Sequence, residues 1–159
     1  MEQSIDWYRQ AALGGQSSAV KELVRYASGQ PGQKSSDLAL GALRQVAESG
    51  DASVMQAYGA LLATLGPERY AEGMAFLERA AGQGDIQAMK TLARLYAAGI
   101  NGQISASEST QWTRLAAEKG DPEAMFQFAV ALDLGFGITP DRQLAHSWHE
   151  KAKKNGFVR

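Results

Sequence analysis

Apolar residues recur every three or four positions in four separate segments of the chain, with polar residues between them. This spacing places the apolar side chains on one face of an α-helix. We therefore expect four amphipathic helices, and no alternating run of β-branched residues predicts a strand. The predicted apolar faces are Ala19, Leu23 and Ala27; Val54, Tyr58 and Leu62; Ala88, Leu92 and Tyr96; and Ala124, Phe128 and Leu132.

A glycine returns at nearly constant intervals of 35, 34, 36 and 36 residues, at Gly15, Gly50, Gly84, Gly120 and Gly156. Such a period is typical of helical repeat proteins. Eight residues before each glycine is a mostly aromatic position, filled by Trp7, Ala42, Phe76, Trp112 and Trp148. Four residues before it is a small or β-branched position, filled by Ala11, Val46, Ala80, Ala116 and Ala152. The three tryptophans are therefore expected to share one structural position.

Each repeat is predicted to contain two helices. Asp51, Asp85 and Asp121 directly follow a period glycine and suit the N-cap of a first helix, and Pro122 suits the first helical position. Glycine-rich turns at 97–105 and 133–141 are expected to end first helices. A second helix then runs to the next period glycine.

The chain is thus predicted to be a leading second helix, residues 2–14, followed by four helix pairs at 16–50, 51–84, 85–120 and 121–156. A single pair cannot bury its apolar stripe, so the pairs must stack on one another. The expected fold is all-α: one domain, residues 1–159, in which about nine helices form an α/α solenoid.

Composition limits the possible partners without identifying one. The chain has 16 basic and 17 acidic residues, so no net field attracts it to nucleic acid or to an anionic membrane. It contains no cysteine and no run of eighteen apolar residues, so neither a disulfide framework nor membrane insertion is expected. The location is cytoplasmic as the sequence stands, or periplasmic if an export signal once preceded it.

Catalytic and metal chemistry is poorly supported. His146 and His149 could share a metal ion by their spacing, but no third ligand is apparent. Ser18 and Lys21 have the Ser-x-x-Lys spacing of penicillin-recognising enzymes, without the companion motifs. We expect no cofactor and no enzymatic activity, with a hydrolase as the remote alternative.

Residues 124–156, AMFQFAVALDLGFGITPDRQLAHSWHEKAKKNG, resemble the Sel-one-like repeats, which are relatives of the tetratricopeptide repeats. Residues 88–103 support the resemblance, and the first two repeats depart from it. Ala42 replaces the aromatic residue, Val54 replaces the leading alanine, and the second repeat lacks a Gly-x-Gly turn. The resemblance implies a right-handed superhelix whose first helices line a concave face, and a role in binding proteins.

The tetratricopeptide relatives bind peptides through first-helix positions outside the core. By the same alignment, the candidate partner-binding residues are Lys21, Arg25, Gln56, Lys90, Arg94, Phe126, Val130 and Asp133. The pairs Lys21 with Arg25 and Lys90 with Arg94 are each four residues apart, and together with Phe126 they suit an acidic segment with an apolar anchor. The alternative is that the cations are simply solvated and that Phe126 and Val130 pack inside the fold.

The expected function is a non-enzymatic scaffold or adaptor for a protein or peptide. The alternative is an inhibitor or immunity protein that neutralises a toxic enzyme; the oligomeric state stays open. The leading second helix has no first helix of its own, so either a preceding segment is missing or a partner covers its exposed side. Phe157 and Val158 are expected to fold back over Trp148.

Overall fold

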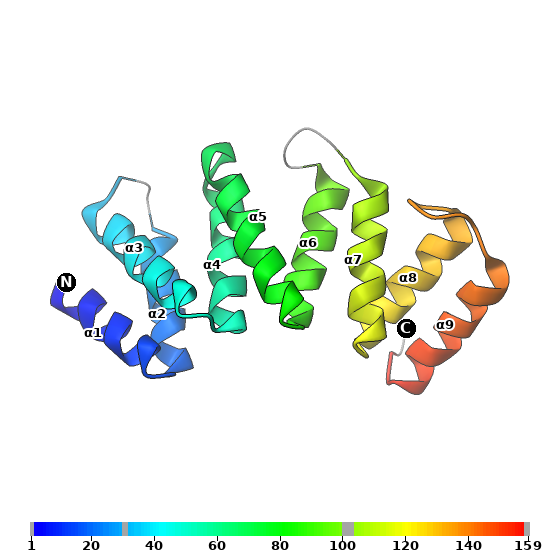
Figure 1. Ribbon diagram of the computed structural model, residues 1–159, viewed down its shortest axis with the longest axis horizontal. Coiled ribbons are helices and arrows are strands. Elements are labelled where there is room, and N and C mark those ends of the chain that lie inside the picture. Colours follow the sequence, from blue (N-terminus) through cyan, green and yellow to red (C-terminus); the bar gives the residue numbers. More distant parts are fainter. Residues whose placement is uncertain (1, 30–31, 100–103, 158–159) are drawn as a thin grey trace. The chain divides into compact units, whose positions relative to one another are not determined.

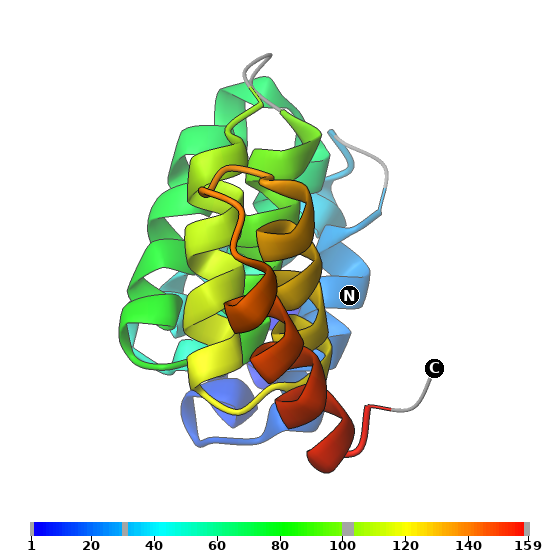
Figure 2. The same ribbon diagram turned by 90° about the vertical axis from the view of Figure 1, so that its right-hand side faces the viewer.

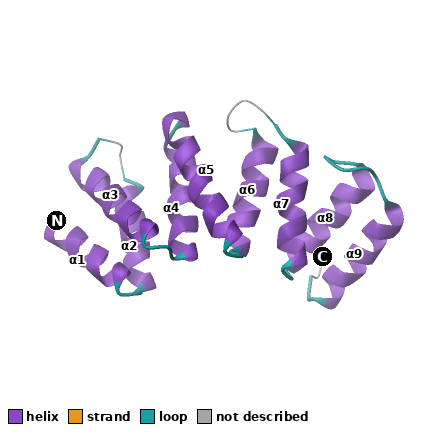
Figure 3. Ribbon diagram, in the orientation of Figure 1, coloured by secondary structure: helices purple, strands orange, loops and turns teal. Residues whose placement is uncertain are grey.

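The computed structural model describes residues 2–29, 32–99 and 104–157. Over these residues the chain is built from helices joined by short turns, with no strand (Figure 3). It divides into two compact units, Met1–Gln83 and Gly84–Arg159. Part of the 88–103 stretch that supports the family resemblance, and Val158, lie outside the described residues.

The unit Met1–Gln83 contains five helices (Figure 1). Two are first helices of repeats and three are second helices. Each helix packs against its neighbours in the chain, and α1 also contacts α3. The helices are α1 (Glu2–Leu13), α2 (Ser17–Ala27), α3 (Lys34–Glu48), α4 (Ala52–Leu65) and α5 (Pro67–Gly82).

The unit Gly84–Arg159 contains four helices that alternate in direction, so that each first helix pairs with the second helix after it (Figures 1 and 2). These helices are α6 (Ile86–Ala98), α7 (Ala106–Glu118), α8 (Pro122–Leu134) and α9 (Arg142–Lys154). The described residues therefore contain the nine helices that the sequence predicts.

The aspartate caps predicted at the starts of the first helices are confirmed. The side chain of Asp51 accepts hydrogen bonds from the backbone N–H groups of Ser53 and Val54. Asp85 and Asp121 accept in the same way from the backbone three residues further on. Asp141, which the sequence analysis did not single out as a cap, does the same for α9. Each cap satisfies an N–H group that has no partner inside the helix.

The period glycines explain the repeat interval. All five have a positive φ, between 85° and 101°, in the turn that ends a second helix. A side chain disfavours this backbone region, so glycine is the residue that fits there. The chain therefore reverses direction at the same point of each repeat.

The predicted apolar faces form the core. Eleven of the twelve residues named for them are buried, and Tyr96 is half-buried. The aromatic position of the second helix packs on this face: Phe76 meets Tyr58 edge-on at 4.9 Å, and Trp148 meets Phe128 edge-on at 5.4 Å. Trp112 is also half-buried, but Trp7 is 61% exposed. The three tryptophans share one position in the repeat, and only Trp7 has no first helix of its own repeat beside it among the described residues.

Candidate functional site

In the unit Met1–Gln83, the candidate residues lie on the first helices α2 and α4. Lys21 and Arg25 are exposed one turn apart on α2, and Gln56 is half-buried on α4. Arg25 forms an ion pair with Glu22 at 2.7 Å, and its guanidinium lies over the ring of Tyr26 at 4.4 Å. Lys21 makes no ion pair with the described residues. The charge of this pair is therefore partly compensated within α2.

In the unit Gly84–Arg159, Lys90 is held by the next repeat. Its ammonium lies 3.3 Å from the carboxylate of Asp121 and 2.5 Å from that of Glu123, and its side chain is only 21% exposed. Burial alone lowers the pKa of Lys90, but hydrogen bonding to Glu123 and attraction to both carboxylates outweigh burial and raise it. Lys90 is therefore a charged link between α6 and α8.

Arg94 lies one turn after Lys90 on α6 and differs from it in burial and in ion pairing. Its side chain is exposed, and it makes no ion pair within the part of the chain that the structure describes. The second basic pair predicted from the sequence thus contains one neutralised cation and one exposed cation.

The sequence left open whether Phe126 on α8 is an exposed anchor for a partner or packs inside the fold. Phe126 is half-buried, which is intermediate between the two. Its ring stacks on Phe157 with 4.7 Å between the ring centroids and meets His149 edge-on at 5.1 Å. The prediction that Phe157 covers Trp148 is wrong, because the turn after α9 directs Phe157 to Phe126. Trp148 is covered instead by Lys151, whose ammonium lies 4.1 Å from the ring centroid.

An open apolar groove of about 490 Å³ follows α8 from Phe126 to the turn beyond its end. All of its lining residues except Gln127 are apolar or glycine. Leu134 is 76% exposed and Phe136 is 42% exposed. The groove is lined by Phe126, Gln127, Val130, Ala131, Leu134, Gly135 and Phe136. Two of the predicted residues, Phe126 and Val130, therefore lie together in one apolar site.

The turn that carries Phe136 is fixed in place by the rest of the unit. The backbone N–H of Phe136 donates to the carbonyl of Ala131 at 3.0 Å, and its carbonyl accepts from the hydroxyl of Thr110 on α7 at 2.6 Å. At Gly137, with φ of 65°, an added Cβ would lie 2.1 Å from the backbone carbonyl of Ala106. The groove is thus formed before any partner binds, which reduces the entropy lost on binding.

Asp133, the last candidate residue, lies on the exposed surface of α8 near the groove residues. Its carboxylate accepts a hydrogen bond from Nε2 of His149 at 3.1 Å. The hydrogen bond to Asp133 and the edge-on contact with the ring of Phe126 give His149 a structural role. Among the described residues, no group of three His, Cys, Asp or Glu side chains is placed to hold a metal ion.

Leu134 and Phe136 are site residues that the sequence pattern did not predict. The signal was present in α8, whose sequence MFQFAVALDL is apolar around most of its circumference. A helix of this kind is usually buried on all sides. Here α7 and α9 cover only part of α8. No helix of the described chain is long and apolar enough to cross a membrane.

The Sel1 repeat family model matches residues 1–16, 52–85, 86–121 and 122–157, which is more than half of the chain. The chain belongs to the Sel1 repeat family. Residues 17–51, which include Ala42, are not matched, whereas the second repeat is matched although it carries Val54 and lacks a Gly-x-Gly turn. Comparison with curated protein sequences gave no match.

Solved structures share the fold. A Sel1 repeat protein from Oxalobacter formigenes is 29% identical with a TM-score of 0.70, over 98% of this chain and 65% of its own length. The protective antigen c5321 of uropathogenic Escherichia coli strains, which displays an SLR fold, is 24% identical with a TM-score of 0.66, over 95% of this chain and 35% of its own. Helicobacter pylori cysteine rich protein B is 15% identical with a TM-score of 0.59, over 80% of this chain and 95% of its own.

These comparisons confirm the predicted fold class, an all-α solenoid of helix-turn-helix repeats. The chain spans less than two thirds of the length of the first two solved structures. Sel1 repeat proteins generally act as non-enzymatic scaffolds in protein–protein interactions.

Proposed function

We propose that this Sel1 repeat chain is a non-enzymatic scaffold that binds a protein or peptide partner through its first helices, with the groove on α8 as the apolar anchor site. The observation that carries the proposal is the exposure of Leu134 and Phe136 beside Val130 in a preformed groove. Contiguous exposed apolar surface of this kind marks interaction sites. A large apolar side chain of the partner would fill the groove and release its water.

The polar candidates are proposed to contact a partner from the unit to which each belongs, and only Arg94 and Asp133 share a unit with the groove. Arg94, Lys21 and Arg25 are exposed cations and favour a segment that carries carboxylates, while Gln56 and Asp133 offer hydrogen bonds. Lys90 is not included, since Asp121 and Glu123 already satisfy its ammonium.

A displayed peptide library tests the anchor directly. We expect the unmodified chain to enrich peptides with a leucine, phenylalanine or tryptophan, and Leu134→Glu to lose most of that enrichment. Leu144→Glu is the matched control, because Leu144 is 41% exposed on α9 but does not line the groove. Equal enrichment by both variants, or no enrichment of apolar peptides, would reject the α8 groove as the binding site.

Charge reversal tests the contribution of the cations. Arg94→Glu is expected to weaken binding of acid-bearing peptides several-fold and to leave the circular dichroism spectrum unchanged. Lys90→Glu is not a suitable probe, because it would place three carboxylates together between α6 and α8 and destabilise the unit. If Arg94→Glu binds acidic peptides as well as the unmodified chain does, electrostatic recognition at Arg94 is wrong.

A further inference from the structure

A small cavity lies in the unit Met1–Gln83, at the end of the helices where α2 and α4 finish and α3 and α5 begin. Its volume is about 80 Å³. All four helices contribute to its walls, and the apolar part of the wall is formed by Ala27, Leu40 and Leu65. The rest of the wall is polar or glycine, which is unusual for a space between packed helices.

The hydroxyl of Ser36 on α3 lies at the closed end of this cavity. Ser36 is only 4% exposed, and its Oγ has no hydrogen-bond partner among the described residues. A buried hydroxyl without a partner is costly, so native structures almost always satisfy it. The hydroxyl faces Gly29, which lines the same cavity, since a Cβ added at Gly29 would lie 2.6 Å from Oγ. The missing partner of Ser36 is therefore expected inside the cavity.

Gly29 keeps the space beside this hydroxyl open. Its φ is not positive, so its backbone does not require glycine in the way that the period glycines do. An alanine side chain at Gly29 would take the space next to Ser36 and turn the hydroxyl away. The absence of a side chain at this position thus preserves the cavity.

Two carboxylates lie at the mouth of the cavity. Asp37 and Glu68 both line it and both are exposed. Each belongs to the first turn of its helix, α3 or α5, which fixes its backbone. Neither carboxylate forms an ion pair or a side-chain hydrogen bond within the described part of the chain. The cavity therefore has one unpaired hydroxyl inside and two unpaired carboxylates at its opening.

The remaining charged residue of the wall, Arg69, is half-buried and has an acidic neighbour of its own. Its guanidinium lies within electrostatic range of the phenol of Tyr58, whose hydroxyl donates to Glu72 at 2.9 Å. Glu72 follows Arg69 by one turn of α5, a spacing that favours attraction between opposite charges. Two carboxylates against one guanidinium leave the wall of the cavity with a net charge of −1.

The volume of the cavity limits the size of a ligand. A water molecule occupies about 30 Å³ in the liquid, and an engineered cavity of about 150 Å³ holds benzene. A cavity of about 80 Å³ has room for roughly two or three groups of the size of water and excludes an aromatic ring. A charged head group with one or two methylenes fits this space.

We propose that this cavity binds a primary ammonium group, carried by a small free amine or by the end of a lysine side chain of a protein. The three N–H donors of an ammonium match the Oγ of Ser36 and the carboxylates of Asp37 and Glu68. The methylenes next to the ammonium lie against the apolar wall. The net negative charge favours a cation over an anion. This site lies in the unit Met1–Gln83 and does not depend on the α8 groove.

Amide chemical shifts in NMR spectra test the proposal, with ethylammonium chloride as the probe. We expect saturable shifts at Gly29, Ser36, Asp37 and Glu68, at about millimolar concentration because so small a ligand has limited binding energy. Sodium chloride and sodium acetate at the same ionic strength should produce no saturable shift at these residues. Saturable shifts of the same size with either sodium salt overturn the proposal.

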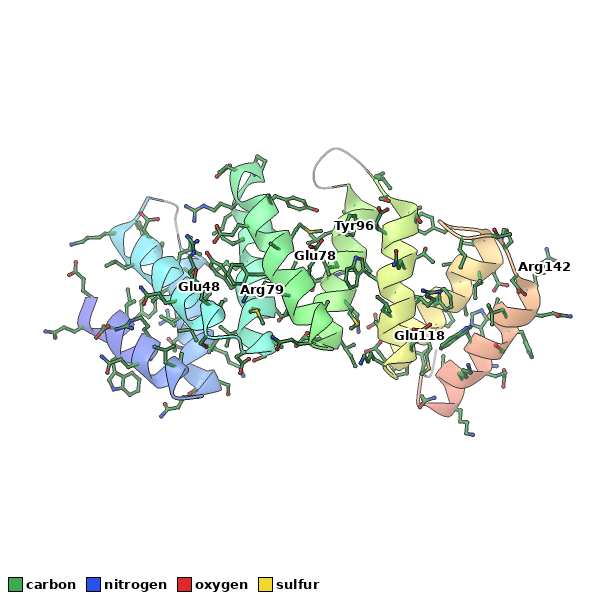
Figure 4. The ribbon with its side chains drawn as sticks, in the orientation of Figure 1. Glu48, Glu78, Arg79, Tyr96, Glu118 and Arg142 are labelled. Carbon is green, nitrogen blue, oxygen red and sulfur yellow. The ribbon has the colours of Figure 1, made fainter. Side chains whose placement is uncertain are left out.

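Variants test the individual groups. Ser36→Ala removes the acceptor and Gly29→Ala occupies the space beside it, so each should weaken ethylammonium binding several-fold. Asp37→Asn combined with Glu68→Gln should weaken it by about tenfold. Glu78→Gln is the matched control, because Glu78 is an exposed carboxylate in the second half of α5 that does not line the cavity (Figure 4). An equal loss of binding in Glu78→Gln overturns the site.

Thermal unfolding of Ser36→Ala provides a second measurement. If Oγ of Ser36 has no partner in the free chain, its removal should not lower the Tm of the free chain. The rise in Tm that ethylammonium gives to the unmodified chain should be lost in this variant. A lower Tm of the free Ser36→Ala chain would show that the hydroxyl is already satisfied, and this overturns the proposal.

A second probe distinguishes the two sources of the ammonium. Acetyl-Ala-Lys-Ala-amide presents the group on a peptide whose termini carry no charge. Binding at least as tight as that of ethylammonium assigns the site to a lysine side chain of a protein, and weaker binding assigns it to free amines; both results support an ammonium site. Saturable shifts with neither probe overturn it. Leu134→Ala, in the α8 groove, should leave binding of both probes unchanged, which separates failure of this proposal from failure of the proposed function.

Discussion

Gly59 on α4 and Gly73 on α5 lie against each other where these two helices are in close contact. A Cβ added at Gly59 would lie 2.7 Å from the carbonyl oxygen of Gly73 and 2.8 Å from Cγ of Leu77. The first contact is to backbone, so no side-chain rotation relieves it. Gly59→Ala should therefore force α4 and α5 apart.

Two opposing effects determine the size of the change. Alanine favours the helix over glycine by about 1 kcal/mol. Overpacking of a close contact costs about 1–3 kcal/mol, and the upper part of that range applies where backbone must move. We expect a net loss of about 1–2 kcal/mol in the free energy of unfolding, with a fall of about 2–8 °C in Tm.

Gly41→Ala is the matched control for this substitution. Gly41 also lies inside a helix, α3, but it is exposed and an added Cβ meets nothing within 4 Å. This variant should therefore gain about 0.5–1 kcal/mol. Urea unfolding followed by circular dichroism measures both variants. A Gly59→Ala variant as stable as Gly41→Ala would show that the close approach of the two helices does not limit stability.

Other predictions follow from the caps, the core and the groove. Asp51→Ala should lower the free energy of unfolding by about 1 kcal/mol, whereas Asp51→Asn should retain the cap, as urea titration will show. Hydrogen bonds from Ser53 and Val54 lower the pKa of Asp51 from its ordinary value. The contribution of the Asp51 carboxylate to stability is therefore present above that ordinary value and is lost as the pH falls through the folded-state pKa. An Asp51→Asn chain that loses as much stability in acid as the unmodified chain would contradict this. Leu92→Ala, at a fully buried site, should cost about 2–5 kcal/mol, whereas Leu134→Ala should change stability by less than about 0.5 kcal/mol. Equal losses in the two variants would mean that Leu134 is a packing residue rather than a free surface.

The sequence was sufficient for features that depend on local chemistry. The period glycines, the aspartate caps and the apolar faces are each determined within a few residues, and the structure confirms them. The order of the helices follows from the same signals. The division into five repeat segments stays a prediction, because residues 17–51 match no family repeat.

The candidate site depended on contacts between helices, which the sequence does not state. Lys90 was predicted to be a free cation, and its link to Asp121 follows only once α6 and α8 are placed side by side. Phe157 was predicted to fold back over Trp148, yet its ring stacks on Phe126 after the turn that follows α9. The exposure of Leu134 depends on how much of α8 its neighbours cover.

The carboxylate of Asp121 serves two adjacent repeats at once. One oxygen accepts the backbone N–H of Ala124 at 2.7 Å and caps α8, and the other lies 3.3 Å from the ammonium of Lys90 on α6. Fraying of α6 would therefore remove a counter-ion from the cap of α8, and fraying of α8 would leave Lys90 with fewer acceptors. Nearest-neighbour coupling of this kind makes adjacent modules melt in concert rather than one by one.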